Sequence, residues 1–320
     1  MSSQARQLLP YSWRKNSTTG SLIYLRDHEL ANHELSTLNA RIVGFDLEWK
    51  PKFYKGGVEN PVAVVQLATD DKILLIQVSA MKIEFPEQLV ALLRDKDIIK
   101  AGVNIAGDLR KLYNDYHVSA RSCVELSYMA RWVDPQWTGQ YSNLIGLARL
   151  VQAYEQCTLP KGRVQLSNWE ALLNDIQQEY AANDAHAGLK VYRKLQTLAL
   201  LMEDMPRDSL YTFDVICGRP EHPTGSCWKP EDPRPAVDDI EDNSANCNVT
   251  DTNTPTPTEG ELDLSRSSMV IKEDVDGGDE TENGAEATLP AKLKRKRLRS
   301  KKICQEPSFV SDSVDIANNG

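Results

Sequence analysis

Short apolar runs fill the first third of this chain, and helical patterns follow them. The runs are rich in Val, Ile and Leu and are short enough to be strands; they cover residues 22–25, 42–49, 62–68, 72–78 and 98–103. Apolar residues then recur every three or four positions, as in amphipathic helices, over residues 86–94, 107–116, 123–131, 143–153, 168–172 and 175–200. Three consecutive strands, 42–49, 62–68 and 72–78, are joined by short connections, which favours an antiparallel meander. The pattern predicts an α/β fold with a mixed central sheet flanked by helices.

The composition changes after about residue 205. Residues 1–200 carry 23 Lys and Arg against 21 Asp and Glu, which leaves 14 and 25 for the remainder, so the net charge of −9 describes the C-terminal part. That part is rich in Pro, Asp, Glu, Asn and Thr, and such sequences bury too little apolar surface to offset the entropy of ordering. The predicted organisation is an N-terminal extension (1–20), a folded domain (21–200), a linker or partly ordered extension (201–229) and a disordered acidic tail (230–320).

Asp46 and Glu48 lie in the predicted strand 42–49, separated by Leu47. Residues i and i+2 of a strand point to the same face, so the two carboxylates are expected side by side. An Asp-x-Glu pair is often only a solvated strand edge. Here the flanking residues are apolar, and a bound cation is one way to satisfy carboxylates in such a setting.

Asp108 follows the predicted strand 98–103 and is expected in the first turn of a helix, where stabilisation by the helix dipole is the simplest role for an acid.

Tyr180 and Asp184 are four residues apart in the predicted helix 175–200, so their side chains share one face. Packing of Tyr180 on the core, with Asp184 exposed, is the plain alternative for that pair. Small residues around them would let this helix approach a sheet closely.

The ordered set Asp46, Glu48, Asp108, Tyr180 and Asp184, with the segments Gly44–Trp49, Lys100–Val103, Val124–Leu126, Ser167–Trp169 and Tyr180–Gly188, resembles the DEDDy group of 3′-5′ exonucleases. Within that group the similarity is to the Werner-type exonuclease domains and their stand-alone relatives, and it covers about residues 20–198. The resemblance implies an RNase H-like (DnaQ-like) fold. The sister group uses a histidine five residues before the last Asp, and that position here is Glu179.

The resemblance also implies the chemistry. Asp46, Glu48 and Asp184 would hold one divalent cation, Mg²⁺ or Mn²⁺, and Asp46 and Asp108 would hold a second. Tyr180 would position the attacking water. The reaction would be hydrolysis of the terminal phosphodiester at a 3′ end, with release of a nucleoside 5′-monophosphate.

Basic residues near the predicted site are candidates for contacts with the phosphates of the substrate. Lys161 and Arg163 precede the Ser167–Trp169 segment, and Lys50 and Lys52 follow the Asp46 strand. A solvated basic loop is the alternative for Lys161 and Arg163.

The block 292–302 has eight Lys or Arg among its eleven residues, a pattern typical of a nuclear localisation signal or of a nucleic-acid contact. We expect a nuclear localisation signal read by the import machinery; a solvated basic run is the alternative. The six cysteines form no CxxC pair, and neither a secretory leader nor a membrane span is apparent, which favours a reducing intracellular compartment, the nucleus in particular.

Three functions remain open from the sequence. DNA is the favoured substrate, with a helicase or repair protein as a possible partner. An RNase D-like exoribonuclease is one alternative, because metal carboxylates act on the phosphodiester and ignore the sugar. A nucleic-acid-binding protein without turnover is the other; it would be expected to lack a metal ligand, and none is lost here.

Overall fold

The computed structural model describes residues 8–17, 20–53, 58–81, 85–138, 143–160, 162–204 and 206–231. They belong to one compact unit. The predicted tail, apart from residues 230 and 231, lies outside the described residues, and so does its basic block 292–302.

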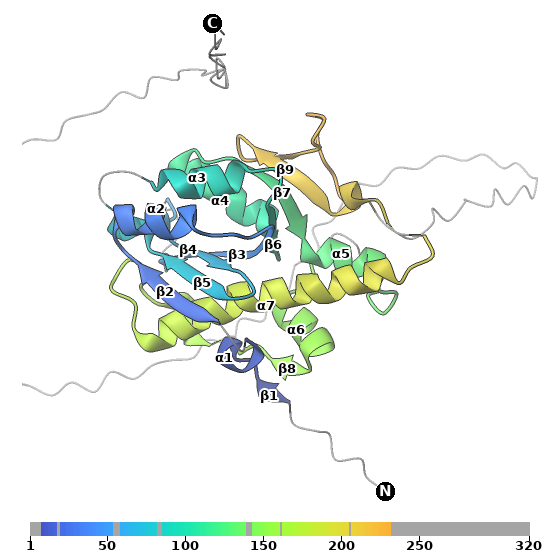
Figure 1. Ribbon diagram of the computed structural model, residues 1–320, viewed down its shortest axis with the longest axis horizontal. Helices are drawn as coiled ribbons and strands as arrows, with labels where there is room; N and C mark the ends of the chain where they lie inside the picture. Colours follow the sequence, from blue (N-terminus) through green and yellow to red (C-terminus); the bar gives the residue numbers. More distant parts are fainter. Residues whose placement is uncertain are drawn as a thin grey trace, which may run out of the picture. The chain divides into compact units, whose positions relative to one another are not determined.

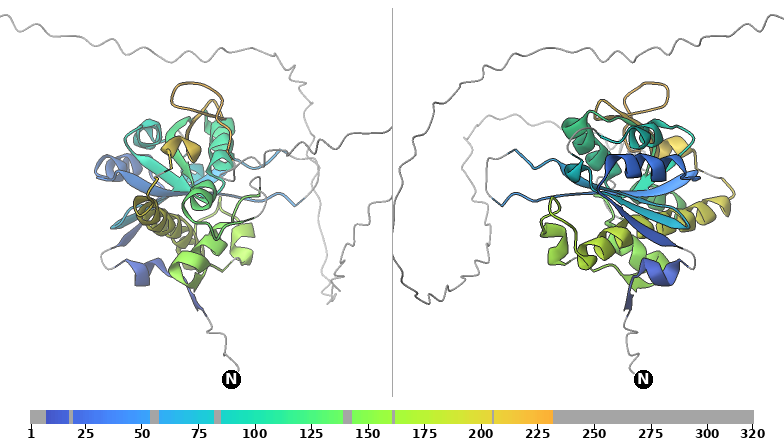
Figure 2. Two further views of the ribbon diagram at one scale, coloured as in Figure 1. Left: turned by 90° about the vertical axis from the view of Figure 1, so that its right-hand side faces the viewer. Right: turned by 60° about the vertical axis from the view of Figure 1, so that its left-hand side comes forward.

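An eight-stranded mixed sheet forms the centre (Figures 1 and 2). Its order is β10 (Arg219–Glu221), β9 (Thr212–Ile216), β7 (Ala120–Glu125), β6 (Ile99–Gly102), β3 (Ile42–Trp49), β4 (Val62–Ala68), β5 (Lys72–Ile76) and β2 (Ser21–Leu25). β3, β6 and β7 are parallel. β3, β4 and β5 form the predicted antiparallel meander, and β2 is parallel to β5.

Helices cover both faces of the sheet (Figure 1). One face carries α2 (His28–Ser36), α3 (Glu87–Arg94) and α4 (Ile105–Tyr116). The long helix α7 (Asp175–Leu200) crosses the other face and packs against α5 (Leu126–Val133) and α6 (Leu147–Glu155). Shorter elements are α1 (Trp13–Asn16), β1 (Leu9–Pro10), β8 (Cys157–Thr158), η1 (Val78–Ala80), η2 (Arg163–Leu166) and η3 (Asp208–Leu210). No described helix carries an apolar stretch that could cross a bilayer.

The alternation along β3 decides which side chains meet α7. Val43, Phe45 and Leu47 are buried in the core beneath α3 and α4. Gly44, Asp46 and Glu48 therefore face α7, as the two-residue period of a strand requires. The pattern of one strand thus separates the hydrophobic core from the functional face.

Gly44 allows α7 to approach the sheet closely. A Cβ atom at this position would overlap the carbonyl oxygen of Ala185 and lie 2.9 Å from the amide nitrogen of Leu189. Ala181, Ala182 and Ala185 of α7 are buried in the same cluster and have only methyl side chains. Close approach in turn brings Asp184 near the carboxylates of β3.

Gly44→Ala is expected to destabilise the fold by about 1–3 kcal/mol, because α7 or β3 must shift to relieve the overlap. Gly188→Ala, on α7, is the matched control. A Cβ there would lie 3.6 Å from the Ala101 carbonyl oxygen, an ordinary contact, and replacing a helix-interior glycine favours the helix by about 1 kcal/mol. Urea unfolding of both variants checks the pair. A Gly44→Ala variant as stable as the wild type would contradict this account of the packing.

Two predicted helices are wrong. Residues 123–131 were expected to be one helix, but residues 120–125 are strand β7, paired with β6 on one side and β9 on the other, and α5 begins at Leu126. Residues 168–172 form a turn rather than a helix. The helix α2 was not predicted at all. Pairing with strands distant in sequence overrode local periodicity in β7.

The predicted domain limits at residues 21 and 200 are too narrow. β9 pairs antiparallel with β7 inside the main sheet, and Phe213, Val215 and Trp228 are buried in the core beside α4. The region 201–229, predicted as a linker or partly ordered extension, therefore supplies β9 and β10 to the sheet.

The segment before residue 20 also packs on the domain. The Trp13 backbone amide donates to Asn183 Oδ1 at 2.8 Å, and its indole Nε1 donates to Glu179 Oε2 at 3.0 Å. The hydroxyl of Tyr11 and Nδ1 of His186 are hydrogen-bonded at 2.7 Å. These contacts tie the N-terminal segment to α7 at Glu179, Asn183 and His186. All three are close neighbours of Tyr180 and Asp184 in the sequence.

Candidate active site

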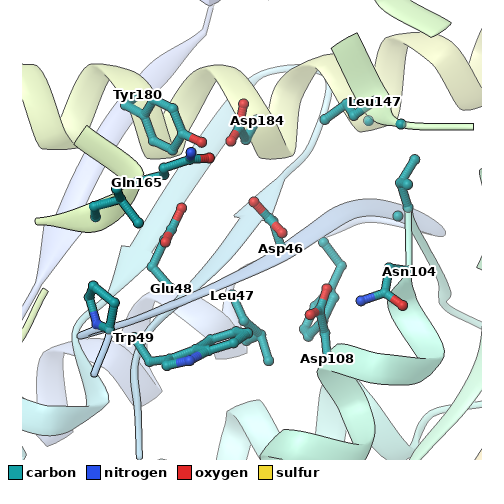
Figure 3. A pocket seen from close by; sticks show the side chains of 17 residues that line it. Asp46, Leu47, Glu48, Trp49, Asn104, Asp108, Leu147, Gln165, Tyr180 and Asp184 are labelled. Carbon is teal, nitrogen blue, oxygen red and sulfur yellow. The ribbon is translucent and has the colours of Figure 1, made fainter. Parts of the chain in front are cut away.

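Asp46, Glu48, Asp108, Tyr180 and Asp184 line a single cavity of about 480 Å³ (Figure 3). The first two come from β3, Asp108 from α4, and the last two from α7. One carboxylate oxygen from each of Asp46, Glu48 and Asp184 lies within 4.8 Å of the others. The structure thus brings together all five residues that were singled out from the sequence, although Asp108 is not one of the closest three.

The carboxylates of this cavity disfavour each other's ionisation. Burial, followed by the charges of Asp184 and Asp108, raises the pKa of Asp46 well above its ordinary value. Burial and the neighbouring acids raise the pKa of Glu48 to about 10. Burial, with a smaller contribution from Glu125, raises the pKa of Asp108 to about 8. A cation bound among these groups would favour the ionised carboxylates and lower their pKa values.

The donor set fits a hard divalent cation. Mg²⁺ and Mn²⁺ prefer carboxylate oxygens, and this cavity offers several from three different elements. Asp46, Glu48 and Asp184 are placed to share one ion. Asp108 lies on the other side of Asp46 from Asp184 (Figure 3).

Tyr180 lies one helical turn before Asp184 on α7 and is hydrogen-bonded to it. Its ring packs against the buried Trp169, with the ring centroids 6.1 Å apart. Burial and the charge of Asp184 raise the pKa of the hydroxyl above its usual value, so the group stays protonated and can donate a hydrogen bond.

The helix that carries Asp108 is capped by Glu125, a residue whose role the sequence did not reveal. The carboxylate of Glu125, at the end of β7, accepts hydrogen bonds from the backbone amides of Ile105 at 3.1 Å and Ser127 at 3.2 Å. It therefore caps the first turns of both α4 and α5. The predicted helix 123–131 hid this role, because it placed Glu125 inside a helix rather than between a strand and a helix.

The predicted substrate-binding residues do not converge on the cavity as the carboxylates do. Lys50 is half-buried and forms an ion pair with Glu170 at 3.7 Å, and Lys52 follows Pro51, which lines the cavity. Arg163 is exposed at the start of η2, whereas Gln165 and Leu166 of the same turn line the cavity. Lys161 lies outside the described residues.

Several residues that line the cavity were not predicted. Gln165 of η2 and Leu147 of α6 face the carboxylates (Figure 3), and Leu166 also lines the cavity. Asn104, at the start of α4, adopts a left-handed conformation with φ of 61°. No local pattern marks these positions, since they meet only through the packing of distant elements.

Comparison with known proteins is consistent with this geometry. A family model described as 3′-5′ exonuclease matches residues 23–199, more than half of the chain. The bifunctional 3′-5′ exonuclease/ATP-dependent helicase WRN of Mus musculus is 40% identical over 159 residues, which are 49% of this chain and 11% of that protein. A 3′-5′ exonuclease of Arabidopsis thaliana is 35% identical over 161 residues, 49% of this chain and 53% of that protein. The chain thus spans about half, or much less, of the length of these relatives.

The fold is shared with a solved structure. The EXO domain of Nibbler from Aedes aegypti superposes with a TM-score of 0.50 and 25% identity, over 60% of this chain and 94% of that domain. The predicted RNase H-like architecture is thereby confirmed. On the match of the family model and the relatives, the chain belongs to the 3′-5′ exonuclease family.

Proposed function

We propose that the protein is a metal-dependent 3′-5′ exonuclease that hydrolyses the terminal phosphodiester of a nucleic acid, preferably DNA, and releases nucleoside 5′-monophosphates. The observation that carries this proposal is the convergence of Asp46, Glu48 and Asp184 within 4.8 Å, with Asp108 and Tyr180 in the same cavity. All the carboxylates that the family chemistry needs are present, which disfavours a binding protein without turnover.

Asp46, Glu48 and Asp184 would hold one Mg²⁺ or Mn²⁺ ion, and Asp46 and Asp108 a second. When bound, such ions lower the pKa of a bound water and stabilise negative charge on the leaving 3′ oxygen. The protonated Tyr180 hydroxyl, fixed by Asp184, orients the water that attacks the phosphorus. Leu147 and Leu166 offer apolar surface to the terminal nucleotide on the far side of the carboxylates.

Tyr180→Phe is expected to lower kcat by about 10- to 100-fold, the usual effect of removing a hydrogen-bonding partner of a metal ligand. The ring would still pack against Trp169, so the stability should change little. Tyr192→Phe, also buried on α7 but away from the cavity, is the control and should retain the wild-type rate. Single-turnover cleavage of a labelled strand measures both variants. Full activity in Tyr180→Phe would remove the tyrosine from the mechanism.

The preference for DNA is part of the proposal, and RNA is the outcome to be tested against it. Purified protein with Mg²⁺ or Mn²⁺ would be given DNA and RNA duplexes with recessed 3′ ends, labelled at either end of the recessed strand. Shortening from the 3′ end, faster on DNA, is expected. Faster RNA cleavage would favour the RNase D-like alternative, and shortening from the 5′ end would contradict the proposed reaction.

The cellular context is proposed from the sequence. The basic block 292–302 would direct the protein to the nucleus through the import machinery, in a reducing compartment. A helicase or repair protein would supply unwound 3′ ends. In the mouse relative, the exonuclease and helicase activities named belong to one chain.

A further inference from the structure

Gln66 is a fully buried glutamine on the functional face of the sheet. It lies in β4 directly opposite Asp46 of β3 in the antiparallel register. Side chains of such a pair project to the same face with neighbouring Cβ atoms. The adjacent same-face residues of β4, Val64 and Ala68, belong to the cluster packed under α7, so Gln66 lies behind Asp46 and beneath that helix.

Both polar atoms of the Gln66 side chain, Nε2 and Oε1, have no hydrogen-bond partner among the described residues. This is unusual, because buried polar side chains are nearly always paired and an unpaired amide is destabilising. The surrounding residues are apolar: Leu75 is its partner on the other neighbouring strand, and Ala181, Ala182 and Ala185 are on the α7 side. Among its partners in the strand register, only Asp46 carries a polar side chain.

Another buried glutamine shows what a structural role looks like in the same fold. Gln77, which follows β5, is also fully buried, but its Nε2 donates to the carbonyl oxygens of Trp169 at 2.9 Å and Ala171 at 2.6 Å. Its Oε1 accepts from the hydroxyl of Tyr24 and from Arg26 Nε. Both polar atoms of the Gln77 side chain thus have hydrogen-bond partners within the protein, whereas those of Gln66 have none among the described residues.

We propose that Gln66 is a positioning residue for Asp46: when a divalent cation binds, the Gln66 amide donates the hydrogen bond that orients the Asp46 carboxylate toward the ion. An amide that donates to a carboxylate forms a charge-assisted hydrogen bond, and such partners behind a ligand fix its orientation. The free-energy cost of burying an unpaired amide at this position is then offset by its function at the neighbouring residue. This inference rests on the proposed metal-dependent function.

The test compares Gln66→Met with Gln77→Met, because methionine preserves the length and volume of glutamine without its amide. Thermal unfolding would be followed during a Mn²⁺ titration without nucleic acid. Metal-free Gln66→Met should melt at or above the wild-type temperature, while its midpoint for stabilisation by Mn²⁺ should rise by about tenfold. The Mn²⁺ concentration for half-maximal exonuclease rate should rise in parallel. Gln77→Met should lose stability and keep the wild-type Mn²⁺ midpoint.

A wild-type Mn²⁺ midpoint in Gln66→Met would overturn the proposal, whether or not the variant is less stable. If Gln66→Met does not fold, Gln66→Asn decides the same question. Asparagine keeps the amide, but its side chain is one methylene shorter, so the amide no longer reaches Asp46. The same rise in the Mn²⁺ midpoint is expected. Failure of the proposed function has a different result. In that case wild-type protein would show no stabilisation by Mn²⁺, and Asp46→Asn would not alter its nuclease activity.

Discussion

Asp46→Asn is expected to lower the exonuclease rate by about 10³-fold or more while leaving the metal-free protein at least as stable as the wild type. The rate falls because Asp46 is the one carboxylate placed to contact both proposed cations, and the electrostatic stabilisation they provide amounts to several kcal/mol, or about tenfold for each 1.4 kcal/mol. The stability is retained because burial, and then the charges of Asp184 and Asp108, already disfavour the ionised form of the carboxyl group that the substitution removes. Asparagine preserves the shape of the side chain.

The measurement combines single-turnover cleavage of a labelled DNA strand with thermal unfolding in EDTA. Asp70→Asn is the control: Asp70 is an exposed acid that pairs with Arg193 at 2.6 Å away from the cavity, and its loss should leave the rate unchanged. Undiminished cleavage by a folded Asp46→Asn protein would refute the proposed mechanism. A rate loss accompanied by unfolding would indicate instead that Asp46 serves the fold.

A chain truncated after Asp204 is expected not to fold, whereas a chain truncated after Ala236 should fold with the stability of the full-length domain. The shorter chain lacks β9 and β10 and exposes the edge of β7. It also loses Phe213, Val215 and Trp228 from the core. Each fully buried side chain of this size contributes roughly 1.5–3 kcal/mol, and a domain has only about 5–15 kcal/mol in total.

Circular dichroism and urea unfolding of the two truncated proteins check this expectation. The longer one should unfold cooperatively, and the shorter one should be unfolded or aggregated through its open strand edge. A cooperative transition of wild-type stability in the shorter protein would show that the fold does not need β9 and β10, in agreement with the domain end at residue 200 that the sequence pattern predicts. The comparison needs no assumption about activity.

Local pattern accounts for much of the site. The two-residue period of β3 separates Asp46 and Glu48 from the core, and the helical spacing of Tyr180 and Asp184 places them on one face of α7. The apolar run before Asp108 indicated a strand followed by a helix, and Asp108 lies in the first turn of α4. These features could be predicted because each depends only on neighbours within about one turn or one strand.

The sequence by itself determined the antiparallel meander, the carboxylates and the family. Only the tertiary structure decided that β9 extends the sheet, that Glu125 caps α4, and that Gln66 lies unpaired opposite Asp46 in the neighbouring strand. Each of these depends on a contact between residues far apart in the chain. Periodicity reports which face a side chain occupies, but strand register and helix packing decide what it meets there.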